Sequence, residues 1–123
     1  MASLPNDVLI VEDDPFIALD LEETVLRLGV QRARTVSNVA GALEMIAARV
    51  PDLALLDVGL LHENSFAVAE RLAMLKIPFA FVTGYGSENV PRAFADRPRL
   101  PKPCPTDVLL LALQRLSEAS GRD

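Results

Sequence analysis

Four acidic residues stand directly after, or at the end of, apolar runs in this chain. Glu12, Asp13 and Asp14 follow the apolar residues 8–11, and Asp57 ends the run "LALLD". Carboxylates held this close repel one another, and each costs free energy when it loses contact with water. A hard divalent cation would relieve both costs, because Mg²⁺ takes oxygen ligands and is usually bound by one or two carboxylates.

Two further residues have side chains that suit a phosphoryl group at the same place. Thr83 ends the apolar run of residues 79–83, and its hydroxyl can donate to a phosphoryl oxygen. Lys102 offers a point charge that can pair with Asp57 or with a bound phosphoryl group. An aspartate beside a metal ion can also attack a phosphoryl donor and form an aspartyl phosphate. These residue types therefore indicate phosphoryl transfer, which needs mainly positioning and charge neutralisation.

Apolar runs alternate with segments of helical period along the whole chain. We expect strands at residues 8–11, 32–36, 53–57 and 79–83, and a brief fifth strand within residues 99–105. We expect helices at residues 15–28, from residue 39 to a stop at Pro51, at residues 66–75 and at about 106–116. Pro91 leaves room only for a short or broken helix between the last two strands.

This alternation predicts an α/β fold with a parallel sheet, in one domain that spans residues 1–123. Ligands of such sheets bind at the carboxyl ends of the strands, near the point where the strand order reverses. The chemically active residues named above all follow or end a strand. We therefore expect them to meet at one edge of the sheet.

Composition narrows the classes of function. A net charge of −5 argues against unaided nucleic-acid binding, which needs a basic surface. Half of the residues are hydrophobic, which argues against disorder, yet no apolar run is long enough to cross a membrane. The single cysteine, Cys104, excludes an internal disulfide, and the first residues do not resemble a signal peptide. A cytoplasmic location is expected. Nucleotide binding is disfavoured because neither GxxxxGK nor GxGxxG occurs.

Four short motifs, taken together, resemble the response-regulator receiver domains of two-component signalling. They are "VEDD" after the first strand, "LLD" ending the third, "VTG" ending the fourth and "KP" after the fifth. Each motif alone is common, but their joint order and their placement at strand ends are specific. The resemblance covers essentially the whole chain. It implies a flavodoxin-like, doubly wound sheet of five parallel strands in the order 2-1-3-4-5.

The resemblance also implies a role for each matching residue. Asp57 would be the phosphoacceptor and a metal ligand. Asp13 would bind Mg²⁺ directly, Glu12 would bind it through water, and the backbone carbonyl of Gly59 would be a further ligand. Thr83 would be the hydroxyl of the conformational switch. Such a protein catalyses only its own phosphorylation and dephosphorylation, and is not otherwise an enzyme.

Lys102 matches the lysine of the family, whose bond to the following proline is typically cis. Other positions depart from the family, which often has proline at position 61, glycine at 65 and an aromatic residue at 99; here they are Leu61, Ser65 and Arg99.

"PFAFVTGYG" and the short fourth helix resemble an alphaproteobacterial subgroup, the FATGUY type, which often consists of single-domain regulators. Tyr85 could either shield a phosphoryl group or face a partner.

The sequence leaves more than one partner and more than one function open. The phosphoryl donor would be a sensor histidine kinase or a histidine phosphotransfer protein, and the output would be a protein–protein contact. A degenerate receiver that binds partners without phosphorylation is the main alternative, because the aromatic switch is missing. An aspartate-nucleophile phosphatase is disfavoured, because Gly59 stands where such enzymes commonly place a second aspartate. Asp14 by itself is more simply read as a helix cap.

The last helix carries apolar residues on two faces. Leu109, Leu113 and Leu116 form an adequate stripe toward the core. Val108 and Leu111 fall on another face, which a soluble monomer would normally keep polar. We therefore expect a surface for a partner or for a homodimer there, beside the shortened fourth helix.

Overall fold

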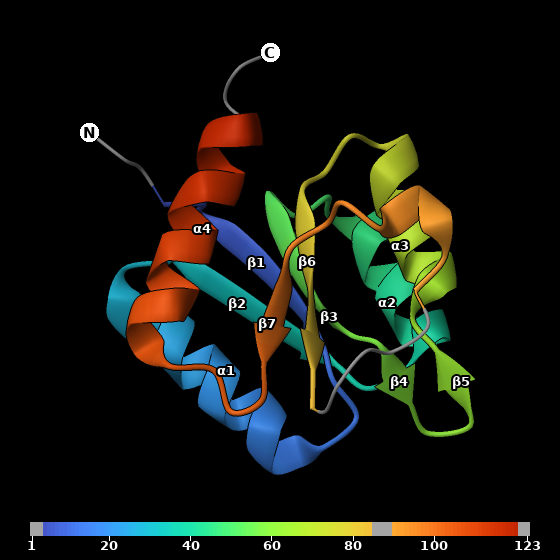
Figure 1. The fold of residues 1–123 in the computed structure, drawn as a ribbon, viewed down its shortest axis with the longest axis horizontal. Coiled ribbons are helices and arrows are strands. Elements are labelled where there is room, and N and C mark those ends of the chain that lie inside the picture. Colours follow the sequence, from blue (N-terminus) through green and yellow to red (C-terminus); the bar gives the residue numbers. More distant parts are fainter. Residues whose placement is uncertain (1–3, 85–89, 121–123) are drawn as a thin grey trace.

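The computed structural model of this protein describes residues 4–84 and 90–120. Five parallel strands form the central sheet in the order β2 (Arg32–Val36), β1 (Asp7–Val11), β3 (Leu53–Asp57), β6 (Phe79–Thr83) and β7 (Arg99–Pro101). Counted among these five strands alone, this is the order 2-1-3-4-5 that the family resemblance implies. Because all five strands run the same way, their carboxyl ends meet at one edge, the lower edge in Figure 1.

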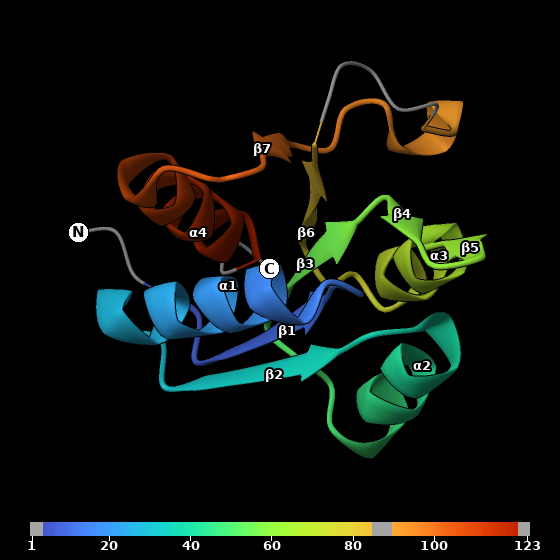
Figure 2. The same cartoon turned by 90° about the horizontal axis from the view of Figure 1, so that it is seen from below.

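Helices cover both faces of this sheet. The helices α1 (Pro15–Leu28) and α4 (Thr106–Ser120) lie on one face, and α2 (Val39–Ala48) and α3 (Phe66–Met74) lie on the other (Figure 2). The last helix continues to Ser120 instead of ending at about residue 116. The prediction followed the stripe of leucines, whereas glutamate and alanine after Leu116 favour helix without adding a large apolar side chain. Among the described residues, no helix combines the length and apolar content needed to span a membrane.

The three central strands are buried along their whole length, as their unbroken apolar runs predict. Their side chains point alternately to the two faces and build two separate cores. Beneath α1 and α4 the core is aliphatic, and it includes Ile10, Leu55 and Leu109. Beneath α2 and α3 it contains Phe79 and Phe81, whose rings meet edge to face at 5.6 Å between centroids. Packed side chains therefore cover both faces of the sheet.

Among the described residues between β6 and β7, a turn of 3-10 helix, η1 (Arg92–Phe94), stands where a fourth helix is expected. This confirms the short or irregular helix that Pro91 predicts. Phe94 is buried, and its ring lies 5.8 Å from that of Phe79 and 6.2 Å from that of Phe81. One aromatic side chain thus covers sheet surface against which a longer helix would otherwise pack.

A small antiparallel hairpin, which the sequence reasoning missed, follows the third strand. It consists of β4 (Gly59–Leu60) and β5 (Glu63–Asn64). Its strands are too short to show alternation, and its turn contains His62 at a φ of 65° where glycine or asparagine would be the usual signal. Glu63 accepts a hydrogen bond from the backbone N–H of Val39 at 3.0 Å, which ties the hairpin to the start of α2.

Candidate functional site

Three carboxylates gather at the carboxyl edge of the sheet. Glu12 and Asp13 follow β1, and Asp57 ends the neighbouring strand β3. Since Val11 pairs with Leu56, the next residues along the two strands, Glu12 and Asp57, lie side by side. One carboxylate oxygen from each of the three residues lies within 4.8 Å of the others. The structure therefore brings together Glu12, Asp13 and Asp57, as the sequence predicts.

Asp14, the third acid of the run, has a different role. It is the N-cap of α1, and its Oδ1 accepts hydrogen bonds from the backbone N–H groups of Phe16 at 2.9 Å and Ile17 at 3.3 Å. The N–H of Asp14 in turn donates to Oε2 of Glu12 at 3.1 Å. The three acidic residues therefore differ in role. Asp14 caps the helix and its N–H orients Glu12, whereas Asp13 is half exposed at the cleft.

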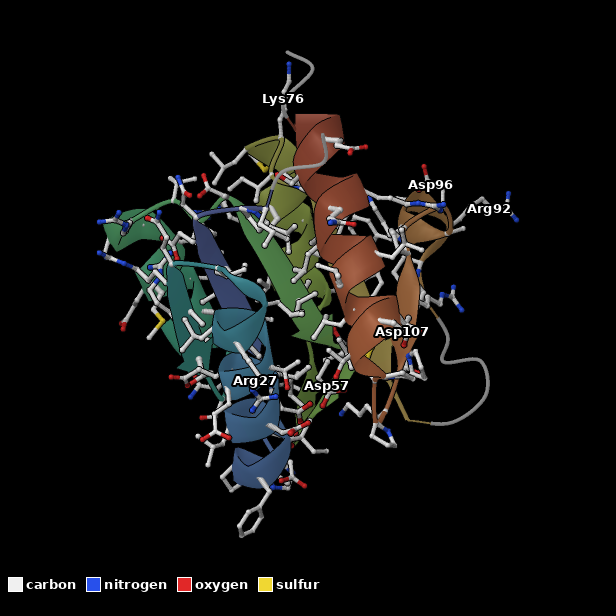
Figure 3. The ribbon with its side chains drawn as sticks, turned by 90° about the vertical axis from the view of Figure 1, so that its left-hand side faces the viewer. Arg27, Asp57, Lys76, Arg92, Asp96 and Asp107 are labelled. Carbon is white, nitrogen blue, oxygen red and sulfur yellow. The ribbon has the colours of Figure 1, made fainter. Side chains whose placement is uncertain are left out.

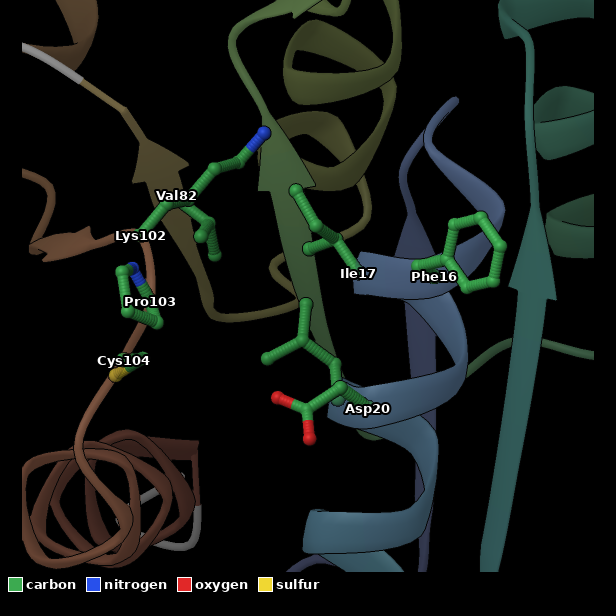
Figure 4. A pocket seen from close by; sticks show the side chains of 8 residues that line it. Phe16, Ile17, Asp20, Val82, Lys102, Pro103 and Cys104 are labelled. Carbon is green, nitrogen blue, oxygen red and sulfur yellow. The ribbon is translucent and has the colours of Figure 1, made fainter.

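Lys102 supplies the positive charge among these acids. Its Nζ lies 2.9 Å from Asp57 Oδ2 and 2.9 Å from Glu12 Oε1. The residue follows β7, and its bond to Pro103 is cis, as the family resemblance implies. Figure 4 shows the lysine side chain reaching from this loop toward the end of β3. A single ammonium group thus bridges two buried carboxylates that come from different strands.

Burial and charge shift the pKa values of the bridge. Loss of water around Glu12 raises its pKa to about 7, and the nearby charge of Asp57 adds to this, while Lys102 and the N–H of Asp14 act in the opposite direction. Burial alone would lower the pKa of Lys102, but its contacts with Glu12 and Asp57 outweigh that effect and raise it. The lysine therefore stays charged at neutral pH, whereas Glu12 titrates near it.

An open cleft of about 620 Å³ lies over this cluster. Asp13, Asp57, Gly59 and Lys102 are among the residues that line it, and an added Cβ at Gly59 would meet no atom within 4 Å. Figure 3 shows Asp57 at this end of the molecule, beside the start of α1. The cleft gives a reagent from solution access to the carboxylate of Asp57.

Thr83 lies at the same edge but is not part of the cleft lining. It is buried at the end of β6, one residue beyond Val82, which pairs with Asp57. The next residue, Gly84, lines the cleft instead. Tyr85, for which the sequence leaves two roles open, lies outside the described residues. The switch role of Thr83 thus stays a prediction.

The donor set fits a hard divalent cation. Three carboxylates and one ammonium leave an excess of negative charge, and oxygen is the ligand atom that Mg²⁺ prefers. Oε1 of Glu12 is buried and has no properly aligned hydrogen-bond donor among the described residues, although Lys102 lies close to it. A buried carboxylate oxygen left in this way is suited to a metal ion or to a water bound to one.

Known proteins resemble this chain in sequence and in fold. The family model for the response regulator receiver domain matches residues 8–114. The solution structure of SdrG from Sphingomonas melonis Fr1 has a TM-score of 0.81 and 44% identity, and the match covers 94% of this chain and 98% of SdrG. A structure of the BeF3-activated conformation of SdrG from Pseudomonas melonis Fr1 has a TM-score of 0.79 and 43% identity, with 95% and 99% covered.

Curated relatives point to the same family. The phyllosphere-induced regulator PhyR of Methylorubrum extorquens is 37% identical over 91 residues, which cover 68% of this chain and 33% of PhyR. Across the curated relatives, the matched region is 27% to 44% of the relative's own length. The family match, the strand order and the acidic cluster beside Lys102 lead to one conclusion. The chain belongs to the response regulator receiver domain family.

Proposed function

We propose that this chain is a phosphoacceptor of a two-component phosphorelay. Asp57 takes a phosphoryl group from a histidine kinase or a histidine phosphotransfer protein, and the modified chain signals through contacts with other proteins. The observation that carries this proposal is the position of Lys102, whose Nζ lies 2.9 Å from both Asp57 and Glu12 beside the open cleft. The similarity to SdrG, for which a BeF3-activated conformation is known, supports it.

The proposed reaction needs few groups. An oxygen of Asp57 attacks phosphorus, the P–N bond of a phosphohistidine breaks, and the imidazole nitrogen leaves with that electron pair. Lys102 neutralises negative charge as the phosphoryl group arrives, and the hydroxyl of Thr83 donates to one of its oxygens. Because the reaction modifies Asp57 of the chain itself, we expect no turnover of a separate substrate.

A bound Mg²⁺ would neutralise charge on the phosphoryl oxygens during transfer. Asp13, Asp57 and the carbonyl of Gly59 would hold it, and Glu12 would contribute through water. Modification of Asp57 then shifts a pre-existing conformational equilibrium that partner proteins read.

The affinity for Mg²⁺ is expected to depend on pH through Glu12. Because its pKa is about 7, most Glu12 carries a proton at pH 6 and little does at pH 8, and that proton competes with the metal. We expect Mg²⁺ to bind about tenfold more tightly at pH 8 than at pH 6, as measured by isothermal titration calorimetry. The variant Glu12→Gln should bind more weakly and lose most of this dependence. Equal affinities of the wild type at the two pH values would contradict the prediction.

The face of α1 beside the cleft is suited to the protein donor. Phe16 is 83% exposed, and Leu19 is 52% exposed one turn later. Next to Phe16, an apolar cavity of about 290 Å³ opens between α1 and the loop of Pro103 and Cys104 (Figure 4). Exposed aromatic side chains beside a pocket are typical anchors of protein interfaces. We propose that the donor protein docks on this face.

Phe16→Ala is expected to slow phosphoryl transfer from the donor protein about tenfold or more and to leave phosphorylation by acetyl phosphate unchanged. A small donor needs no docking surface, so the two rates should separate. Met74→Ala is the matched control, because Met74 is 78% exposed and ends α3 at the opposite end of the sheet. An equal loss of rate with both donors would show that Phe16 affects the phosphoryl-transfer step and not the docking of the donor protein.

The proposed function is tested by intact mass after incubation with acetyl phosphate, with and without Mg²⁺. We expect the wild type to gain one phosphoryl group only with Mg²⁺, and Asp57→Asn to gain none. If the wild type gains none, the Mg²⁺ titration decides between two cases. If the chain binds Mg²⁺ but is not phosphorylated, it accepts a phosphoryl group only from a protein donor. If it does not bind Mg²⁺, the degenerate receiver is supported.

A further inference from the structure

A polar cavity of about 370 Å³ lies at the amino ends of the strands, which form the upper edge of the sheet in Figure 1. Its lining comes from the starts of β1 and β2, from the residue just before β3 and from the segment after α2. Every lining side chain is polar or charged except that of Val50. The proposed phosphoacceptor site, at the opposite edge of the sheet, does not use this cavity.

The acidic side chains at the cavity already accept hydrogen bonds. Oδ1 of Asp7 accepts from Nε of Arg34 at 3.1 Å, and its Oδ2 accepts from Nη2 of Arg34 at 3.1 Å and from Nε of Arg49 at 3.2 Å. Oδ2 of Asp52 accepts from the backbone N–H groups of Asn6 at 3.2 Å and of Asp7 at 3.0 Å. Of these four carboxylate oxygens, Oδ1 of Asp52 alone has no hydrogen-bond donor among the described residues.

Hydrogen-bond donors, in contrast, are in surplus. Arg49 uses its Nε in the ion pair, and its two Nη groups make no hydrogen bond within residues 4–84 and 90–120. The same holds there for the guanidinium of Arg32 and for the side-chain amides of Asn6 and Gln31, which all line the cavity. With Arg34 behind the lining, three arginines stand against two aspartates. The cavity is therefore positive in a chain whose net charge is −5.

A phosphate group suits these free donors. The planar guanidinium of arginine donates two parallel hydrogen bonds to phosphate oxygens, and Arg32 and Arg49 bring two such groups to one cavity. A divalent cation is disfavoured, because the same two arginines would repel it.

The size of the cavity and the free oxygen of Asp52 indicate a phosphate group with an organic part. A volume of about 370 Å³ lies within the range of sites for small organic molecules, so it leaves room beside a phosphate group. Oδ1 of Asp52 can accept a hydrogen bond from a hydroxyl group of the ligand, whereas it would repel a bare phosphate dianion.

We propose that this cavity binds a small phosphomonoester that carries a hydroxyl group. Arg32 and Arg49 hold the phosphate, and Asp52 accepts a hydrogen bond from the hydroxyl. Because both arginines are exposed, the binding is weak and decreases as the salt concentration rises. The site lies at the far end of the sheet from Asp57, so the proposal holds whether or not the chain accepts a phosphoryl group.

The test is an amide NMR titration without Mg²⁺ and at constant ionic strength. The ligands are glycerol 3-phosphate, methyl phosphate and inorganic phosphate, each up to about 20 mM. We expect the signals of Asn6, Gln31 and Arg32 to shift to saturation with glycerol 3-phosphate, while the signal of Lys102 stays in place. Methyl phosphate and inorganic phosphate should each bind at least threefold more weakly. If inorganic phosphate binds as tightly as glycerol 3-phosphate, the ligand is the free ion, and the assignment of a phosphomonoester is overturned.

Arg32→Gln and Arg49→Gln should each weaken the binding of glycerol 3-phosphate at least tenfold, because each removes charged hydrogen bonds to the phosphate. Arg92→Gln is the matched control and should change it less than twofold, because Arg92 is exposed in η1, which precedes the opposite edge strand β7. Thermal unfolding of each variant establishes that it is folded. A wild type whose signals at Asn6, Gln31 and Arg32 do not shift overturns the proposal. An equal loss of affinity in Arg92→Gln also overturns it, because it would show general attraction of anions without a specific site.

Discussion

Replacing Lys102 with methionine is expected to lower the free energy of unfolding at pH 8 by about 3–5 kcal/mol. The lysine side chain is the cation that touches both Glu12 and Asp57, and both of these carboxylates are buried. Without it, two negative charges remain side by side with little water around them. The same change should slow phosphorylation by acetyl phosphate on the order of a hundredfold, because the arriving phosphoryl group loses its counter-charge.

The loss of stability in Lys102→Met should depend on pH with a definite sign. The pKa of folded Glu12 lies above its unfolded value even with the lysine present, and it rises further once the lysine is gone. Between the two values, the folded chain binds a proton that the unfolded chain releases. The variant should therefore gain stability as the pH falls from 8 toward about 5.5.

Urea unfolding at both pH values measures this effect. Lys76→Met is the control, because Lys76 is the only other lysine of the chain and is exposed at the end of the molecule far from Asp57 (Figure 3). It should change stability by less than about 0.5 kcal/mol. A Lys102→Met variant as stable as the wild type at pH 8 would show that the bridge is unimportant for the fold.

The second large effect is expected at the opposite end of the sheet. Asp7 is buried at the start of β1, and Arg34 of β2 donates to it from Nε and Nη2, both at 3.1 Å. Arg34 is itself mostly buried and also donates to the backbone carbonyls of Met45 and Arg49. The more exposed Arg49 adds a contact of 3.2 Å from its Nε, which solvent weakens.

Asp7→Ala should lower the free energy of unfolding by about 3–5 kcal/mol and the melting temperature on the order of 10 °C, because it leaves Arg34 buried without an anion. Calorimetry measures both quantities. The double variant Asp7→Ala with Arg34→Met should lose less than the sum of the single changes, since no unpaired charge remains. Phosphorylation of the folded fraction should be unchanged. If the single changes are simply additive, the two side chains do not stabilise each other.

The sequence predicts that the acidic residues of the site and Lys102 lie together, because parallel strands bring their carboxyl ends to one edge of the sheet. Asp57 and Glu12 are 45 positions apart, yet each follows an apolar run that reads as a buried strand, so their meeting requires only that both strands join one sheet. The same logic places Lys102 at that edge. The short fourth helix is also predictable, because Pro91 alone restricts the segment.

Other features depend on contacts that no local pattern shows. The pairing of Asp7 with Arg34 requires the register of β1 against β2, in which Asp7 lies beside Arg32. The hairpin of residues 59–64 depends on a positive φ at His62 and on the bond from Val39 to Glu63. The cap that Asp14 forms on α1 is predicted from the sequence, whereas the hydrogen bond from the N–H of Asp14 to Glu12 is not.

The most direct test of the central claim is to locate the modified residue. After incubation with acetyl phosphate and Mg²⁺, borohydride reduces an acyl phosphate to an alcohol and so converts a phosphorylated aspartate to homoserine. Peptide mass spectrometry should then find homoserine at position 57 and unmodified aspartate at positions 13 and 14. A phosphorylated chain that yields homoserine at another position, or at none, would contradict the assignment of Asp57 as the phosphoacceptor.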